Sequence, residues 1–164
     1  MNRIVVCDTG PLLHLREANI LGLLHAAGEI FIPPAVAQEF SRNSPGVMIP
    51  DWVIVKELDE LSTQKALEWQ KQIDAGESAA IALSLQLHSD WLLSDDVIAR
   101  QFAEILGLEV HGSIGVLLWA IATGHVEGKD AALKALDALT GSSLWISDRV
   151  LEQARKAITI LYKK

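Results

Sequence analysis

The sequence contains a single cysteine, so the chain cannot form a disulfide bond within itself. Cys7 lies inside the short apolar run of residues 4–7, which suits a small buried residue better than a nucleophile. No apolar stretch approaches the roughly 18 residues that a membrane-spanning helix needs. The apolar run near the N-terminus reaches an acid too early to be the core of a signal peptide. We therefore expect a cytoplasmic protein without a membrane segment.

Motifs that would indicate other chemistries are also missing. The sequence has no GxxxxGK(S/T) phosphate loop, and the glycine pattern of residues 112–115 is too short to indicate a dinucleotide site. The five histidines lack the spacing of zinc ligands, which favours surface or partly buried positions for them. The sequence thus argues against both a nucleotide-binding loop and a zinc site.

Positive charge is scarce, since the net charge is −7. A protein that coats nucleic acid normally neutralises phosphates with basic patches, so this balance argues against such a protein. It does not exclude a nuclease whose cations are metal ions. The exception is residues 141–164, which carry five Lys and Arg against two Asp and Glu, a net +3. This segment is either a solvated helix face or a contact for RNA phosphates or an acidic partner, and Trp145 is its candidate RNA contact.

The pattern of apolar residues predicts strands that alternate with helices. At 164 residues the chain is long enough to bury a sizeable core, and half of its residues are hydrophobic. We expect strands at residues 3–7, 29–32, 52–55, 91–94 and 108–110. We expect two short helices between residues 11 and 24, and further helices at 34–45, 62–74, 77–88, 97–106, 113–124, 129–139 and 147–161. Ser113 and Ser147 are the expected N-caps of two of these helices.

This order of elements predicts an α/β fold with a central, mainly parallel sheet flanked by helices. We expect a single domain of residues 1–164, because no linker or low-complexity segment interrupts the pattern. The helices of about residues 129–164 would pack on this domain or extend it.

Acidic residues follow two of the predicted strands. Asp8 comes directly after the first strand, and the pair Asp95–Asp96 follows residues 91–94. In an open parallel sheet, ligands bind beyond the carboxyl ends of the strands, and a carboxylate there must be hydrated, paired or bound to a cation. Two adjacent carboxylates repel each other unless a cation joins them, and Arg100 is the candidate partner or a phosphate ligand. The pattern predicts a site for a hard divalent cation such as Mg²⁺ or Mn²⁺.

Each candidate acid also has an ordinary structural interpretation. Asp8 is a good N-cap for the next helix, and Asp95 or Asp96 can cap a later one. Glu39 alone would be an exposed residue of a short helix, and Glu77 alone would complement a helix dipole. The combination is more specific than any of its members.

Five segments together resemble one known family. They are DTGPL (residues 8–12), IPPAVAQE (32–39), GESAAIAL (76–83), LLSDDVIAR (92–100) and GSIGVL (112–117). In this order they are similar to the motifs of PIN-domain proteins, in particular a prokaryotic branch related to the VapC-type toxins. The resemblance runs from about residue 3 to residue 124, and the C-terminal helices are less diagnostic.

This resemblance implies a three-layer PIN-like fold and an endoribonuclease that depends on Mg²⁺ or Mn²⁺. Such proteins are often the toxin of a toxin–antitoxin pair and often homodimers, so the implied partners are RNA, a small antitoxin protein and a second copy. By position, Asp8 matches the first metal ligand, Glu39 the second and Glu77 the third. Glu77 departs from the family pattern, because toxin sequences commonly have the shorter Asp there.

The resemblance leaves two candidates for the fourth acid. Asp96 matches if Ser94 stands for the Thr or Ser that usually comes two residues earlier, and Asp95 matches in the competing alignment. Thr9 and Ser94 would orient the carboxylates through their hydroxyls. The implied reaction is hydrolysis by a hydroxide that the metal delivers, with no side chain as nucleophile.

Three alternative functions also use acids at strand ends. A phosphatase with a covalent aspartate usually has a second acid two residues later, where this chain has Gly10. A phosphoacceptor receiver domain carries its adjacent acids after the first strand, whereas here they follow a later one. The third alternative is a nucleic-acid- or protein-binding module that keeps the PIN fold and the metal acids but has negligible nuclease activity.

Overall fold

Five short strands form the centre of the molecule. They are β1 (Ile4–Cys7), β2 (Glu29–Ile32), β3 (Val53–Val55), β4 (Trp91–Leu93) and β5 (Val110–His111). The computed structural model describes residues 2–163, and its sheet has the order β3-β2-β1-β4-β5. All four neighbouring pairs run parallel, which confirms the predicted α/β class.

The central strand β1 is buried on both faces. Its last three residues, 5–7, are fully shielded from solvent between β2 and β4. Helices cover both faces of a parallel sheet, so its inner strands are uninterrupted apolar runs. From β1 the chain passes outward to β2 and β3, and it then returns to the other side of β1 as β4. This reversal opens a crevice at the carboxyl ends of β1 and β4, where Asp8 and the Asp95–Asp96 pair follow.

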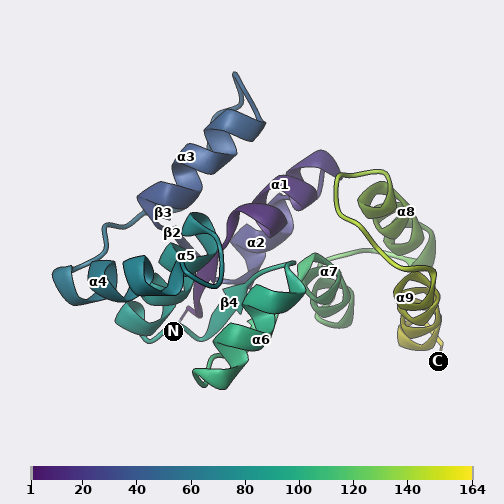
Figure 1. Ribbon diagram of the computed structural model, residues 1–164. Helices are drawn as coiled ribbons and strands as arrows, with labels where there is room; N and C mark the ends of the chain where they lie inside the picture. The colour runs from purple at the N-terminus through teal and green to yellow at the C-terminus, as the bar shows by residue number, and fades with distance from the viewer. Residues whose placement is uncertain (1, 164) are drawn as a thin grey trace.

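Helices cover the sheet on both sides. They are α1 (Thr9–Glu17), α2 (Gly22–Ala27), α3 (Pro34–Asn43), α4 (Glu60–Trp69), α5 (Ala75–Leu87), α6 (Val97–Ile105), α7 (Ser113–Ala122), α8 (Lys129–Thr140) and α9 (Asp148–Leu161). α5 packs on β1 and β4 with α4 against it, whereas α2 contacts β2 and α7 contacts β5 from the other side (Figure 1). The predicted three-layer arrangement is confirmed. Within residues 2–163, no helix is both long and apolar enough to cross a membrane.

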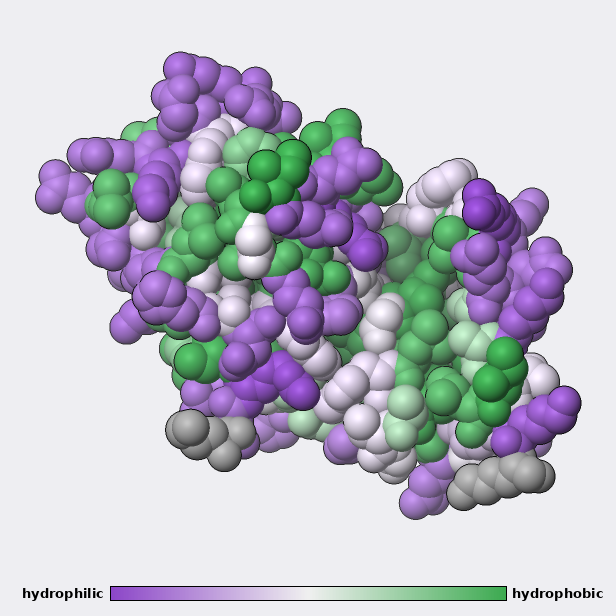
Figure 2. Space-filling view, turned by 90° about the horizontal axis from the view of Figure 1, so that it is seen from below, coloured by the Kyte–Doolittle hydropathy of each residue, from purple (hydrophilic) through white to green (hydrophobic). Residues whose placement is uncertain are grey.

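The C-terminal helices α8 and α9 pack against each other and against α7, and α8 also contacts α1. Buried apolar residues form one cluster that reaches from Val5 in β1 to Ile158 in α9. We therefore propose that these helices extend the same domain. Seen from below, the surface is hollowed between the side that carries α8 and α9 and the rest of the molecule, and apolar residues gather there (Figure 2).

The predicted elements are all present, and the differences lie at their ends. The backbone breaks between α1 and α2 at Asn19, which has a positive φ of 62°. α4 ends at Trp69 instead of residue 74, and α5 begins at Ala75 instead of residue 77. β5 lies slightly later than predicted, at residues 110–111. The apolar pattern locates an element well but says little about its ends, which depend on local capping bonds.

One of the two predicted serine caps is wrong. Ser147 caps α9 as predicted, because its hydroxyl oxygen accepts a hydrogen bond from the N–H of Val150. Ser113 does not cap α7, whose N-cap is Gly112. The hydroxyl of Ser113 donates instead to the carboxylate of Asp95, which is the stronger acceptor.

Candidate active site

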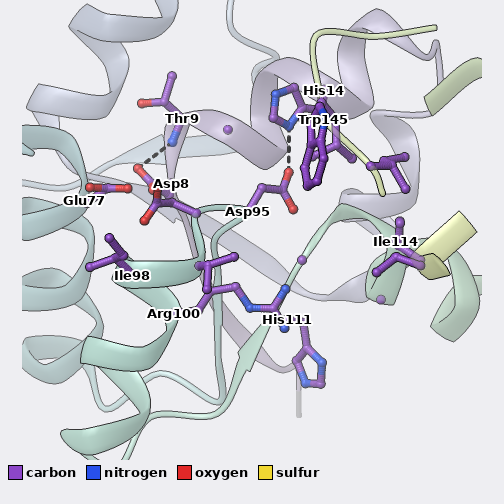
Figure 3. A pocket seen from close by; sticks show the side chains of 18 of the residues that line it. Asp8, Thr9, His14, Glu77, Asp95, Ile98, Arg100, His111, Ile114 and Trp145 are labelled. Atoms are coloured by element: carbon purple, nitrogen blue, oxygen red, sulfur yellow. Dashed lines mark hydrogen bonds and ion pairs between the residues drawn. The ribbon is translucent and has the colours of Figure 1, made fainter. Parts of the chain in front are cut away.

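A cavity of about 840 Å³ opens at the carboxyl edge of the sheet, and six carboxylates line it. They belong to Asp8, Glu39, Asp74, Glu77, Asp95 and Asp96. Five of these are the acids that the sequence singled out, so the structure brings the whole predicted set to one cavity. The sixth, Asp74, was not predicted. Figure 3 shows the carboxylates of Asp8 and Glu77 close together, with Asp95 nearer to Trp145.

Asp8 connects the end of β1 to the start of α1. Its Oδ1 accepts a hydrogen bond of 2.8 Å from the N–H of Thr9, so the predicted helix-capping role is real. Its Oδ2 accepts a longer bond of 3.4 Å from the hydroxyl of Ser94 at the end of β4. Asp8 is only 6% exposed. Oδ1 of this carboxylate caps the helix, and the side chain also lines the cavity.

Glu39 reaches the cavity from α3. The hydroxyl of Thr9 donates a hydrogen bond of 2.8 Å to its Oε2. Its carboxylate also rests against Gly76 in α5, where even a methyl group would collide with it. Thr9 and Ser94 were both predicted to orient carboxylates, and their hydroxyls contact Glu39 and Asp8 respectively. Glu39 is therefore not the freely exposed helix residue that it would be in isolation.

Glu77 and Asp74 cap α5 reciprocally. The N–H of Glu77 donates to Oδ1 of Asp74 at 2.8 Å, and the N–H of Asp74 donates to Oε1 of Glu77 at 3.0 Å. This is a capping box, which a sequence signals by an acceptor residue followed three positions later by Glu. The letters DAGE of residues 74–77 carry that signal, so Asp74 could have been found.

Asp95 is held by three hydrogen-bonding groups. Its Oδ1 accepts from the N–H of Ser113 at 2.7 Å, and its Oδ2 accepts from the Ser113 hydroxyl at 2.6 Å. Nδ1 of His14 lies 2.7 Å from the same Oδ2. Asp95 thus joins the end of β4 to α1 and to the start of α7. The sequence carries no signal for the contact with His14, which lies 81 positions away.

Asp96 makes a simpler set of contacts. As the N-cap of α6 it accepts one hydrogen bond of 2.8 Å, from the N–H of Ala99 to Oδ1. It is exposed to solvent, and its charge acts on the carboxyl of Glu77 across the cavity. Of the two adjacent acids, Asp96 is therefore the one that faces Glu77, whereas Asp95 faces His14 and Ser113.

The carboxylates destabilise one another's ionised forms. Burial is the main cause that raises the pKa of Asp8 from its ordinary value of 3.8 to about 8. The nearby charges of Glu77, Asp74 and Glu39 also raise it, and the hydrogen bond from Thr9 opposes them. Asp8 therefore binds a proton at neutral pH when no cation is present.

Glu77 is affected in the same way. Partial burial is the largest cause that raises its pKa from 4.5 to about 7, and the charges of Asp74 and Asp96 add to the effect. Two neighbouring acids with raised pKa values mark a place where negative charge is in excess. A cation bound there would stabilise both ionised carboxylates, and perturbed acids of this kind are typical of functional sites.

The chemistry of the donors fits a hard divalent cation, since Mg²⁺ and Mn²⁺ prefer carboxylate oxygens. As placed, however, no three His, Cys, Asp or Glu side chains within residues 2–163 form a group that could hold a metal ion. Several of the carboxylates point at nearby N–H and O–H donors instead. Metal binding requires side-chain rotations of these residues.

Arg100 is a cation on the same cavity. Its guanidinium lies close to Gly112, which is also close to Oδ1 of Asp95. Among the residues that the structure describes, Arg100 forms no ion pair with any carboxylate. The prediction that it neutralises the adjacent acids is thus not supported, and its other predicted role, contact with a phosphate, stays open.

The far wall of the cavity is apolar. It is formed by Ile114 of α7, and by residues 144–146 and Val150 at the start of α9, whereas Ile98 of α6 lies near Asp8 and Glu77 (Figure 3). Trp145, predicted from the sequence as a candidate RNA contact beside the basic segment, lies in this wall. The cavity therefore combines an acidic wall with an apolar one.

The chain is similar to one described family. A family model with the description PIN domain matches residues 4–159. A search among curated proteins gave no match. The matched range includes every strand, every acid of the cavity and most of the C-terminal pair of helices.

Proposed function

This chain belongs to the PIN-domain family, whose members are generally nucleases, and on that premise we propose that it is an endoribonuclease dependent on Mg²⁺ or Mn²⁺. One observation carries the proposal. Acids from four separate segments, Asp8, Glu39, Glu77 and the Asp95–Asp96 pair included, line one cavity at the carboxyl edge of the sheet. Burial and mutual repulsion raise the pKa values of two of them, so the cavity favours a bound cation.

We assign the metal ligands to Asp8, Glu39, Glu77 and Asp96. A bound Mg²⁺ or Mn²⁺ supplies a water of lowered pKa and stabilises charge on the phosphoryl oxygens. The buried Asp8 anchors the set, because the sheet and α1 fix its backbone. Asp95 acts as a positioning residue that holds His14 and the start of α7 in place.

Arg100 is proposed to bind the scissile phosphate. It lines the cavity, and it forms no ion pair among residues 2–163. A guanidinium matches the geometry of two phosphate oxygens. Its electrostatic attraction to a phosphate is stronger in a cavity than in bulk water. The hydroxyls of Thr9 and Ser94 contact Glu39 and Asp8, and they are proposed to orient these carboxylates once the side chains have rotated to bind metal.

Removal of the metal tests the proposal directly. Cleavage of single-stranded or structured RNA is expected with Mn²⁺ or Mg²⁺, to stop in EDTA and to return when the metal is restored in excess. Fragment analysis on a denaturing gel measures it. Cleavage that persists in EDTA would show a metal-independent or contaminating nuclease and would contradict the proposal.

A binding module with the PIN fold is the second candidate. It is favoured by one observation, namely that the carboxylates do not form a ready group of metal ligands as placed within residues 2–163. Calorimetry with Mn²⁺ distinguishes the two. Metal binding without any turnover of RNA would favour the module.

We also propose that the protein is the toxin of a toxin–antitoxin pair and forms a homodimer. The support is the resemblance to the VapC-related branch, together with exposed apolar residues outside the cavity such as Ile105 on α6, which suit a protein interface. A small protein encoded beside this chain that blocks its RNA cleavage would support the pair.

Gly76→Ala is expected to slow RNA cleavage at least about tenfold while leaving stability unchanged or slightly higher, since small misplacements of catalytic groups are costly. A Cβ at Gly76 would lie 2.6 Å from Cδ of Glu39, so the flexible Glu39 side chain must move. The helix itself gains up to about 1 kcal/mol from alanine. Cleavage rates and urea midpoints measure the two effects.

Gly22→Ala is the matched control, because no atom lies within 4 Å of the Cβ that it adds to α2. We expect this variant to cleave RNA at the rate of the wild type. A normal rate in Gly76→Ala would argue against a role for Glu39.

A further inference from the structure

Trp145 is 84% exposed, although it lies in the wall of the cavity that holds the acids. Tryptophan is usually well buried, because its large apolar surface is costly to hydrate. The residue belongs to the connection between α8 and α9. Figure 3 shows its indole beside His14 and on the same side of the cavity as Asp95. An exposed aromatic ring in the wall of this cavity offers a binding surface for a flat, apolar ligand.

The surroundings of Trp145 point to a ligand that is apolar on one part and anionic on another. Ile114 and Val150 line the same cavity as the ring and add apolar surface to it. Arg149, four positions after Trp145 in the chain and outside the cavity lining, is exposed and forms no ion pair among the described residues. Arg100 is the cation that lines the cavity itself.

A nucleotide has this combination of a flat base and a phosphate. Bases stack on exposed aromatic rings regardless of their identity, and arginines bind the phosphates between them. The base must be unpaired, because a base inside a duplex is already stacked on both faces. The net +3 of residues 141–164 adds a local attraction for the RNA strand, in a chain that is acidic elsewhere.

We propose that Trp145 stacks on an unpaired base next to the cleavage site, and that Arg149 binds a phosphate beside that base. This inference rests on the proposed function, and it names single-stranded RNA as the substrate class. The C-terminal pair of helices then has a role of its own, since it brings a base-binding platform to a cavity whose acids come from the rest of the chain.

Binding of a short single-stranded RNA of mixed sequence, measured by fluorescence anisotropy in EDTA, tests the proposal without cleavage. Trp145→Ala is expected to weaken binding about tenfold or more, and Trp145→Phe to stay within about threefold of the wild type, since both rings stack. Folding is not at risk, because the side chain buries little surface. Met48→Ala is the matched control: Met48 is 85% exposed, lies outside the cavity, and its loss should change nothing.

Two further probes separate stacking from general attraction. Trp145→Ala should leave the binding of a duplex of the same sequence unchanged, and also that of an RNA that lacks a base at the contacted position. Arg149→Gln should weaken the binding of every RNA. It should also reduce the slope of the logarithm of the binding constant against the logarithm of the salt concentration by about one, the value expected for the loss of one phosphate contact.

Several outcomes would overturn the inference. One is equal binding of single-stranded RNA by the wild type and Trp145→Ala, and another is an equal loss on single strands and duplexes. A dimer that Trp145→Ala converts to a monomer, with RNA binding unchanged, would show that a second copy covers the ring. A wild type that binds RNA through Trp145 but never cleaves it contradicts only the proposed nuclease function.

Discussion

Asp8→Asn is expected to abolish metal-dependent RNA cleavage and, in the same protein, to raise the stability of the metal-free fold at pH 8. Asparagine has the same shape and can still accept the hydrogen bond from Thr9, so the cap of α1 remains. It lacks the charge that a divalent cation needs. Loss of a central ligand should lower the rate by about a thousandfold or more, equivalent to roughly 4 kcal/mol of transition-state stabilisation.

The gain in stability follows from the raised pKa of Asp8. In the unfolded chain this carboxyl ionises near pH 3.8, and in the folded, metal-free protein near pH 8. Between these values the folded state holds the extra proton, so the stability of the wild type falls as pH rises from about 4 to 8 and then levels off. The uncharged amide of the Asp8→Asn variant removes this dependence, and the gain at pH 8 is on the order of a few kcal/mol.

Urea unfolding in EDTA at several pH values, together with gel assays of cleavage, measures both effects. Asp59→Asn is the matched control, because Asp59 also caps a helix, α4, but lies outside the cavity. The Asp59→Asn control should cleave RNA at the rate of the wild type. Its free energy of unfolding should not exceed that of the wild type at any pH between 4 and 8. A fully active Asp8→Asn protein would sink the proposed mechanism.

Asp96→Asn and Asp95→Asn are expected to have opposite consequences. Asn is as good an N-cap as Asp, so Asp96→Asn should change stability by less than about 1 kcal/mol. It should nevertheless reduce cleavage about a hundredfold or more, because it removes a proposed ligand that faces Glu77. A comparison of the two variants therefore tests which of the two adjacent acids binds the metal.

Asp95→Asn should instead destabilise the fold by about 1–3 kcal/mol. Its new NH₂ group would face the Ser113 hydroxyl or Nδ1 of His14, where the wild type has an accepting oxygen. Under conditions where both variants are folded, Asp95→Asn should lower the rate of cleavage less than Asp96→Asn does. Thermal unfolding and single-turnover cleavage measure the two effects. The reverse pattern would identify Asp95 as the ligand.

The sequence predicts the sheet and part of the site for physical reasons. Uninterrupted apolar runs such as residues 91–93 indicate buried parallel strands, and an acid directly after such a run must lie at the carboxyl edge. This reasoning finds Asp8 and the Asp95–Asp96 pair. Glu39 and Glu77 lie on helices, where an acid is unremarkable, so only the family resemblance points to them.

What the sequence did not predict depends on contacts between distant segments. The contact between His14 and Asp95 arises only when α1 packs beside the end of β4. Ser113 looks like a helix cap until Asp95 is placed next to it. Trp145 reaches the cavity because α8 and α9 pack on α7, and no local pattern encodes that packing.

The strand order has a consequence for how the chain folds during synthesis. β4 pairs with β1 on the side opposite β2, so one edge of β1 stays open until residues 91–93 have left the ribosome. Until then the nascent chain has neither Asp96 nor the platform that carries Trp145, and an open edge strand is prone to pair wrongly. If the chain is the ribonuclease that we propose, its set of acids is incomplete until Asp96 has been made, and its proposed base-binding surface forms only when nearly the whole polypeptide is present.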